Sequence, residues 1–278
     1  MRAFCGVIIA AAIVAAPRAQ ADPSLDELLV RAGSYVRDLE VQMARVMGDE
    51  VYHQRAATSR SSVTRTIQAE MLFWWLDEDH VWLSVRNVLS VDKKAVADSK
   101  DRLEHALVAP EPAPASDVVV SRSARLRGLQ EESARFDIGS VHRTTSNPTE
   151  VLQYLLAENQ AQFAFTRAAE HRVNASRAWK ITFREQRRPT VLRFGALDVP
   201  TSGAVWVRAD DGIVVRTERT VSLPRFTATI TVDFHRDPKL ALWVPKRMEE
   251  TYGNVVRCWS DYSNYRQFET SGRILPPK

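Results

Sequence analysis

The sequence predicts an α+β fold: a curved antiparallel β-sheet, shaped as a half-barrel, covered on one face by a long N-terminal helix and an inserted helical lid. Three observations predict it. Apolar residues recur every three or four positions over residues 25–46, as on an amphipathic helix. From residue 163 onward, apolar and polar residues alternate in short runs joined by tight turns, as in antiparallel strands. Residues 98–160 have a helical pattern and form the insertion.

The chain begins with the features of a secretory signal peptide. Arg2 is followed by an apolar run over residues 3–16 and by the small-x-small sequence Ala19-Gln20-Ala21. The run is shorter than the roughly 20 residues that a membrane-spanning helix needs. We therefore expect cleavage after Ala21, a periplasmic or secreted protein, and one domain over residues 22–278 with the helical insertion at about 98–160.

The first helix of the mature chain has a clear start. Ser24 and Glu27 form a capping box, in which the two side chains satisfy free backbone N–H groups. Gly48 is expected to end the helix. The apolar stripe of this helix must pack against another layer, and it consists of Leu25, Leu28, Leu29, Ala32, Val36, Leu39, Met43 and Val46.

Strands are expected on both sides of the insertion. Before it, the period-two pattern covers residues 50–56, 67–76 and 81–91. After it, the pattern covers residues 163–168, 178–185, 190–194, 203–207, 214–223, 227–235, 242–252 and 256–270. Within the insertion, helices are expected over residues 98–108, 117–136 and 147–160. Asn147 as N-cap and Pro148 at the first helical position mark the start of the last one.

The most regular ribbon runs over residues 226–235. Phe226, Ala228, Ile230, Val232 and Phe234 alternate with polar residues, so they share one face of a strand. Their burial is worth on the order of 10 kcal/mol at about 1.5–3 kcal/mol for each large side chain. A monomer rarely leaves such a face in water. Either the protein's own side chains or a guest must cover it.

The tryptophans allow the same two interpretations, because all seven fall on expected strands. Large aromatic residues fill a core, or they line a hollow that accepts a ligand. Under the second interpretation, the expected wall of an apolar cavity consists of Phe226, Ile230, Val232, Phe234, Trp75, Trp206 and Trp243.

Charge and motifs argue against several function classes. The chain has 38 Lys and Arg against 34 Asp and Glu, a net charge of +4, and its arginine clusters lack the interleaved aromatic residues of a single-strand nucleic-acid binder. We expect no nucleic-acid partner. The sequence contains no HExxH, no Gly-x-Ser-x-Gly and no glycine-rich phosphate loop. We therefore expect no metal, no cofactor and no enzymatic activity.

Two further expectations concern single positions near the C-terminus. Glu249 and Glu250 are adjacent on an expected strand, so they point to opposite faces and cannot act as an acid–base pair. Both are expected on a solvated, salt-bridged strand. Cys258, the single cysteine after cleavage, is expected to pack as a small hydrophobic residue.

Two resemblances rest on local sequences. The stretch Ala204–Glu218, with the ribbon at Thr227–His235, resembles a strand-turn-strand of the LolA/LolB-like superfamily of periplasmic lipoprotein carriers. Most of the mature chain resembles a set of uncharacterised secreted bacterial proteins, through residues 132–139, 145–149, 244–252 and 260–268. The resemblance implies a hollow that holds acyl chains or an apolar protein segment, with a lipid or a lipidated protein as partner.

Two hypotheses stand ahead of an enzyme. The leading one is a non-enzymatic protein that binds a lipid, acyl chain or lipidated partner in a cavity between sheet and helices, with peripheral membrane contact. The alternative is a protein-interaction or envelope-sensor module with a filled core and a working outer face such as Lys246–Glu250. The third hypothesis is a hydrolase, which would need scattered Ser, His and acidic residues to converge, for example His235 with Glu249 or Glu250 in a cleft. The first two hypotheses differ in what they predict for the space between sheet and helices: the first predicts an open cavity, and the second predicts a filled core.

Overall fold

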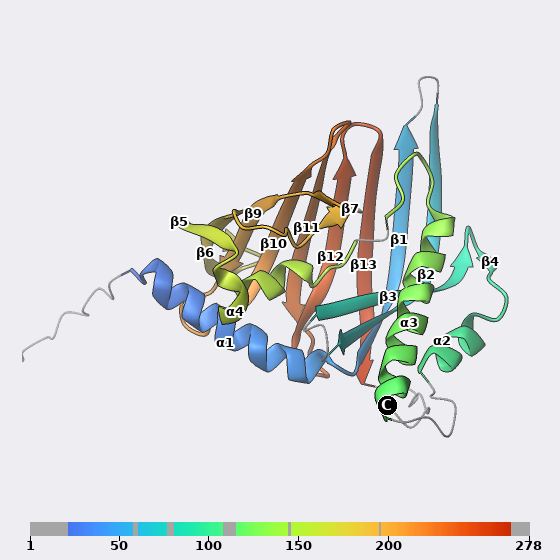
Figure 1. The fold of residues 1–278 in the computed structure, drawn as a ribbon, viewed down its shortest axis with the longest axis horizontal. Coiled ribbons are helices and arrows are strands. Elements are labelled where there is room, and N and C mark those ends of the chain that lie inside the picture. Colours follow the sequence, from blue (N-terminus) through green and yellow to red (C-terminus); the bar gives the residue numbers. More distant parts are fainter. Residues whose placement is uncertain are drawn as a thin grey trace, which may run out of the picture.

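One antiparallel sheet of eleven strands forms the body of the protein (Figure 1). The computed structural model describes residues 22–57, 61–76, 81–107, 115–143, 146–194 and 196–267. The expected signal peptide at residues 1–21 lies outside the described residues. The α+β prediction, with a curved open sheet and an N-terminal helix, is confirmed.

The helices of the described chain are α1 (Leu25–Met43), α2 (Ser99–Leu107), α3 (Ala115–Ser133) and α4 (Ala157–Gln160), with 3₁₀ segments η1 (Ala134–Phe136) and η2 (Glu150–Leu155). The first strands are β1 (Val46–Ala57), β2 (Ser62–Leu76), β3 (Val81–Val91) and β4 (Lys94–Ala95). The later ones are β5 (Phe163–Val173), β6 (Ser176–Glu185), β7 (Arg193–Phe194), β8 (Leu197–Asp198), β9 (Thr201–Val207), β10 (Val214–Ser222), β11 (Thr227–Arg236), β12 (Trp243–Tyr252) and β13 (Val256–Gln267).

The strand order explains the path of the insertion. The sheet runs β4-β3-β2-β1-β13-β12-β11-β10-β9-β6-β5, and β7 and β8 form a separate two-stranded sheet. Consecutive strands β4 and β5 therefore lie at opposite edges of the large sheet. The chain between them, residues 96–162, must cross from one edge to the other. We call the part of this chain over residues 137–160 the crossing segment.

Helix α1 starts as expected and ends earlier than expected. The Ser24 hydroxyl accepts a hydrogen bond from the Glu27 backbone N–H at 3.2 Å, and the Glu27 carboxylate accepts one from the Ser24 backbone N–H at 2.7 Å. The helix ends at Met43, and Gly48 lies inside β1. A Cβ at Gly48 would stand 2.7 Å from the Tyr265 ring, so this glycine serves close packing within the sheet and is not a helix stop.

The insertion divides its helices between the two faces of the sheet. Val46 packs on the inner face with α1, whereas the next residue, Met47, packs on the outer face with Leu72, Leu103 and Leu126. Helices α2 and α3 therefore cover the outer face of β2 and β3. The crossing segment and α1 cover the inner face.

The prediction of a single helix over residues 147–160 is wrong. Residues 150–155 form the 3₁₀ segment η2, Leu156 is extended, and α4 is only four residues long. Five consecutive residues of η2, from Val151 to Leu155, are buried. A regular amphipathic helix would expose one side of this segment, whereas here α1 packs on one side and the sheet on the other. Asn147 is not the expected N-cap: the residue before η2 is Thr149, and the Asn147 side-chain oxygen accepts the Thr149 N–H at 2.9 Å in the turn that precedes it.

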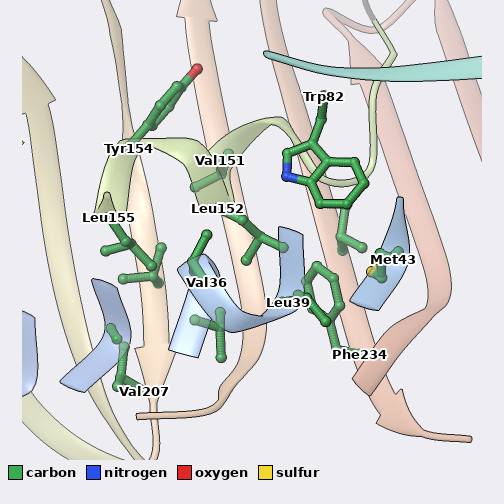
Figure 2. Close-up of a cluster of buried hydrophobic side chains, with 14 of the residues drawn as sticks. Val36, Leu39, Met43, Trp82, Val151, Leu152, Tyr154, Leu155, Val207 and Phe234 are labelled. Atoms are coloured by element: carbon green, nitrogen blue, oxygen red, sulfur yellow. The ribbon is translucent and has the colours of Figure 1, made fainter. Parts of the chain in front are cut away.

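The main core lies between α1, the crossing segment and the inner face of the sheet. Figure 2 shows side chains of α1 (Val36, Leu39, Met43), of η2 (Val151, Leu152) and of the strands (Phe234, Trp82) gathered in one layer. Phe234 is 1% exposed and Ile230 is 7% exposed. Helix α1 and η2 therefore cover the part of the ribbon that carries Ile230, Val232 and Phe234.

Replacing Phe234 with Ala should lower the free energy of unfolding by about 3–5 kcal/mol, because it leaves a cavity in a closely packed layer. Val41, 79% exposed on the outer side of α1, is the matched control, and Val41→Ala should change stability by less than about 0.5 kcal/mol. Urea unfolding monitored by tryptophan fluorescence measures both. Equal stability of the two variants would contradict the assigned core.

Candidate functional site

A buried polar network crosses the inner face of the sheet between two apolar clusters. One cluster is the main core under α1, and the other, which includes Tyr52, Ile67, Ala228 and Val256, packs near the β1–β2 end. Four charged residues stand at the network's centre and are at most 7% exposed. They are Glu50 on β1, Arg86 on β3, Arg143 in the crossing segment and Glu250 on β12.

Glu50 and Arg86 form a bidentate ion pair. The Arg86 Nε donates to Glu50 Oε2 at 2.5 Å, and Nη2 donates to Oε1 at 2.9 Å. The Ser260 hydroxyl donates to Glu50 Oε1 at 2.6 Å. The Arg86 guanidinium also lies 4.1 Å from the centre of the Tyr52 ring. The pair thus has the additional hydrogen bonds that a buried ion pair needs.

Arg143 fastens the crossing segment to the sheet. Its guanidinium pairs with Asp137 at 2.8 Å, donates to the Tyr52 hydroxyl at 2.9 Å and donates to Gln54 Oε1 at 2.8 Å. The same Gln54 oxygen accepts the Ile138 backbone N–H at 2.9 Å. One arginine therefore connects its own loop to two side chains of β1.

Glu250 is fully buried, and one of its two oxygens is unpaired. Oε2 accepts hydrogen bonds from the hydroxyls of Tyr252 at 2.6 Å and Ser146 at 3.0 Å. Within the described part of the chain, Oε1 has no hydrogen-bond partner. Burial raises the pKa of Glu250, and the Tyr252 hydrogen bond and the Arg86 and Arg143 charges oppose that rise.

For Glu249 and Glu250, the prediction of opposite faces is correct and the prediction that both are solvated is wrong. They do point to opposite faces, and Glu249 lies on the outer face, where it pairs with Arg247 at 3.0 Å. Glu250 is buried and not solvated, which corrects the expected salt-bridged strand. The sequence could have predicted this burial, because side chains two positions apart on a strand share a face, and Glu250 shares its face with the buried Met248 and Tyr252. Cys258 packs as expected, and burial raises the pKa of its thiol to about 11.

The network connects the crossing segment to the sheet, and His235 lies away from it. His235 pairs with Val244 on β12, whereas Glu250 pairs with Ile230, five residues back along β11. That separation amounts to about 16 Å along a strand, so His235 does not converge with Glu250, which the enzyme hypothesis would have needed. Among the residues that the structure describes, no three His, Cys, Asp or Glu side chains are grouped to hold a metal ion.

The seven residues expected to line a cavity do not form one wall. Ile230, Val232 and Phe234 lie together in the main core. Phe226 lies in the second cluster, with its ring edge-to-face to Tyr252 at 6.1 Å. The side chain of Trp75 lies outside the described part of the structure.

Trp206 and Trp243, the other two tryptophans of the expected cavity wall, lie in different places. Trp206 lies on the outer face with Ala204 and Val215, with the Lys180 ammonium 5.0 Å from its ring, and this corrects its assignment to the inner wall. Its neighbours Val205 and Val207 are the residues of β9 that point inward. Trp243, at the start of β12, is partly buried between the main core and the Trp206 cluster.

A sizeable cleft lies elsewhere, beside the N-terminal end of α1. It has a volume of about 580 Å³ and is lined by Asp22, Pro23, Glu27, Arg31, Glu170, Arg177, Trp179, Ala209 and Asp210. Most of these residues are charged, so the lining is not that of an acyl-chain site. A second space, beside Arg86 and Arg102, measures about 10 Å³ and has room for a single water molecule.

Comparisons with known proteins give fold neighbours at low similarity. No family model and no curated protein matches the chain. An outer-membrane lipoprotein-sorting protein domain from Vibrio parahaemolyticus has 9% identity and a TM-score of 0.35, covering 85% of this chain and 93% of its own. A DUF1329 family protein from Desulfovibrio piger has 10% identity and a TM-score of 0.39, with the same coverage. A LolA superfamily protein from Nitrosomonas europaea has 9% identity and a TM-score of 0.37, covering 92% and 96%.

Likeness at these scores transfers no function. Within the described residues, no helix is long and apolar enough to cross a membrane.

Removing one partner of the central ion pair should be more damaging than removing both. Arg86→Met leaves Glu50 buried and unpaired, and we expect a loss of about 3–5 kcal/mol in the free energy of unfolding. Adding Glu50→Leu should recover most of this loss, because no charge is then left without a partner. Denaturant unfolding of the single and double variants measures the difference. A double variant less stable than Arg86→Met would contradict this account.

Glu250 should make the protein less stable as the pH rises. Its folded pKa is raised above the ordinary value of 4.5, so between these two values the folded state holds a proton that the unfolded state releases. The free energy of unfolding therefore falls as pH rises through this window. Glu250→Gln cannot ionise, so its stability relative to the parent should improve from pH 4.5 upward. Urea unfolding between pH 4 and pH 8 measures it, and a constant difference would contradict the raised pKa.

Proposed function

We propose that this protein is a non-enzymatic interaction module of the periplasm or the cell exterior, with a filled core and a binding surface on the outside of the sheet. The buried network carries the proposal. Glu50, Arg86, Arg143 and Glu250 stand across the inner face, where the middle of a long acyl chain would lie. A guest there would separate buried charges from their partners, which costs several kcal/mol.

The outer face offers a surface for a protein partner. Helices α2 and α3 pack over β2 and β3, and most outer side chains of β10 to β13 are exposed or half-buried, with Val215 a buried exception. They are arranged in cross-strand ion pairs, such as Arg216 with Asp233 at 2.5 Å and Arg247 with Asp261 at 2.9 Å. A surface with ordered charges of both signs can bind a protein whose own charges are arranged in the complementary pattern.

A second candidate remains for the half of the molecule under α1. The cluster there is apolar throughout, and α1 is joined to the sheet by its C-terminal end, where β1 follows directly. Displacement of α1 with η2 would expose Ile230, Val232 and Phe234 to an acyl chain. This is the lipid-binding hypothesis in a form that requires the cover to open.

A bromine-labelled fatty acid tests both candidates in one experiment, with tryptophan fluorescence and hydrogen exchange of residues 25–43 as readouts. The filled core predicts no saturable quenching and unchanged exchange on α1. The lipid-binding candidate predicts saturable quenching that Trp82→Phe reduces, together with faster exchange on α1, because Trp82 lies in the main core. Saturable quenching would overturn the filled core.

The outer face is tested by charge reversal. Arg247→Glu should abolish a cross-linked adduct formed on the cell envelope, because it breaks the pairs with Glu249 and Asp261 that order this surface. Arg45→Glu, an exposed arginine before β1, gives the same change in net charge and should leave the adduct unchanged. Equal amounts of cross-linked adduct from the two variants would contradict the proposal for this face.

A further inference from the structure

One end of the sheet carries exposed apolar residues. The pairing of Ala57 with Ser62, of Ser222 with Thr227 and of Arg184 with Ser202 places the β1–β2, β10–β11 and β6–β9 connections at the same end. The β12–β13 turn joins them, because the Ala57 N–H donates to the Val255 carbonyl at 2.7 Å and the Gly253 N–H to the Thr227 carbonyl at 2.9 Å. In Figure 1, β1 and β13 reach this end side by side.

Four of the large apolar residues that the structure exposes belong to this end. They are Val63 at the start of β2, Val191 and Leu197 in the β6–β9 connection, and Val255 in the β12–β13 turn, and their exposed fractions range from 42% to 55%. Partly buried Leu223 and Phe226 adjoin them. The expected strand at residues 190–194 is reduced here to the two residues of β7, so Val191 stands in a loop.

Arginine dominates the charge of the same end. Arg55, Arg184, Arg187 and Arg225 are exposed there, and within the described residues none of them forms an ion pair. The carboxylates of these strand ends and connections are Glu185 and Asp198. Glu185 is buried and accepts backbone N–H groups, including that of Val191 at 2.7 Å. Asp198 pairs with Arg188 at 3.3 Å and Arg193 at 3.5 Å.

The opposite end carries charges of both signs. The β9–β10 turn has Asp210 and Asp211, and α1, which begins beside it, has two acidic residues in its first turn. Exposed Arg172, Arg177 and Arg236 lie at the strand ends there. The first end differs because it combines exposed apolar side chains with arginines that have no ion-pair partner among the described residues, and an anionic surface attracts such arginines.

We propose that the end formed by Val63, Val191, Leu197 and Val255, with its unpaired arginines, docks on an anionic lipid surface. Exposed apolar side chains on loop tips enter the headgroup region, while surrounding arginines contact lipid phosphates and carboxylates. A protein partner is less favoured, because these residues belong to separate strand ends and connections around exposed arginines and, within the described part of the chain, make no continuous apolar groove. The proposal holds whether or not the interior opens.

Vesicle sedimentation tests this proposal with the mature chain. Vesicles of 70% phosphatidylcholine and 30% phosphatidylglycerol should bind it at 50 mM salt, vesicles of phosphatidylcholine alone should bind it weakly, and 500 mM salt should release it. Arg187→Glu with Arg225→Glu should weaken binding by about thirtyfold or more, since each basic residue near such a surface is worth about 1 kcal/mol. The control pair Arg45→Glu with Arg172→Glu, at other exposed positions, should bind as the parent does.

The contribution of the apolar residues to vesicle binding is tested with a second set of variants. Leu197→Asp with Val255→Asp should reduce binding by at least about tenfold, because two apolar tips no longer enter the headgroup region. Val41→Asp with Val30→Asp, both exposed on α1, should bind as the parent does. Thermal unfolding checks that all variants are folded. Equal binding by end and control variants, or binding to heparin without binding to anionic vesicles, would overturn the proposal.

Discussion

The bonds of Arg143 join the segment that crosses the inner face to the sheet beneath it. Strands β4 and β5 lie at opposite edges of the sheet, so the chain between them has to cross the inner face. A loop that crosses a buried surface brings polar backbone groups with it, and these need partners. Arg143 supplies them by donating to the carbonyls of Ile138 and Val141 while it binds Tyr52 and Gln54 on β1. The position of η2, and with it the packing of α1, depends on this attachment.

The same network limits what the interior can do. A hollow that carries an acyl chain needs a continuous apolar floor, and here charged residues divide the floor into two parts. A buried polar network with many hydrogen bonds favours one arrangement of the chain over its alternatives. A half-open pocket would lose that selectivity, because an unpaired buried charge is costly. The proposal accordingly places contact with partners on the exterior, where the polar outer face and the arginine-rich end of the sheet are exposed.

Local chemistry made the first helix and most strands predictable. The capping box at Ser24 and the alternation of the ribbon at 226–235 depend on neighbours in the sequence, so the sequence alone shows them. The segment at 147–160 has the same kind of local start signal, yet it is 3₁₀ in part because α1 and the sheet bury both of its sides. The candidate site was harder to find. Arg143 meets Tyr52 across 91 positions, and no local pattern encodes such a contact.

The pairing of the first strand with the last strand has a consequence for biogenesis. β1 and β13 are neighbours in the middle of the sheet, and Glu50 bonds Ser260 across 210 positions. Until β13 has been delivered, β1 has an unpaired edge that can join other chains. A sheet closed by such distant residues forms slowly. Holding the chain unfolded until its C-terminal end has emerged would therefore raise the yield of native protein, and truncation before β13 would leave an aggregation-prone fragment.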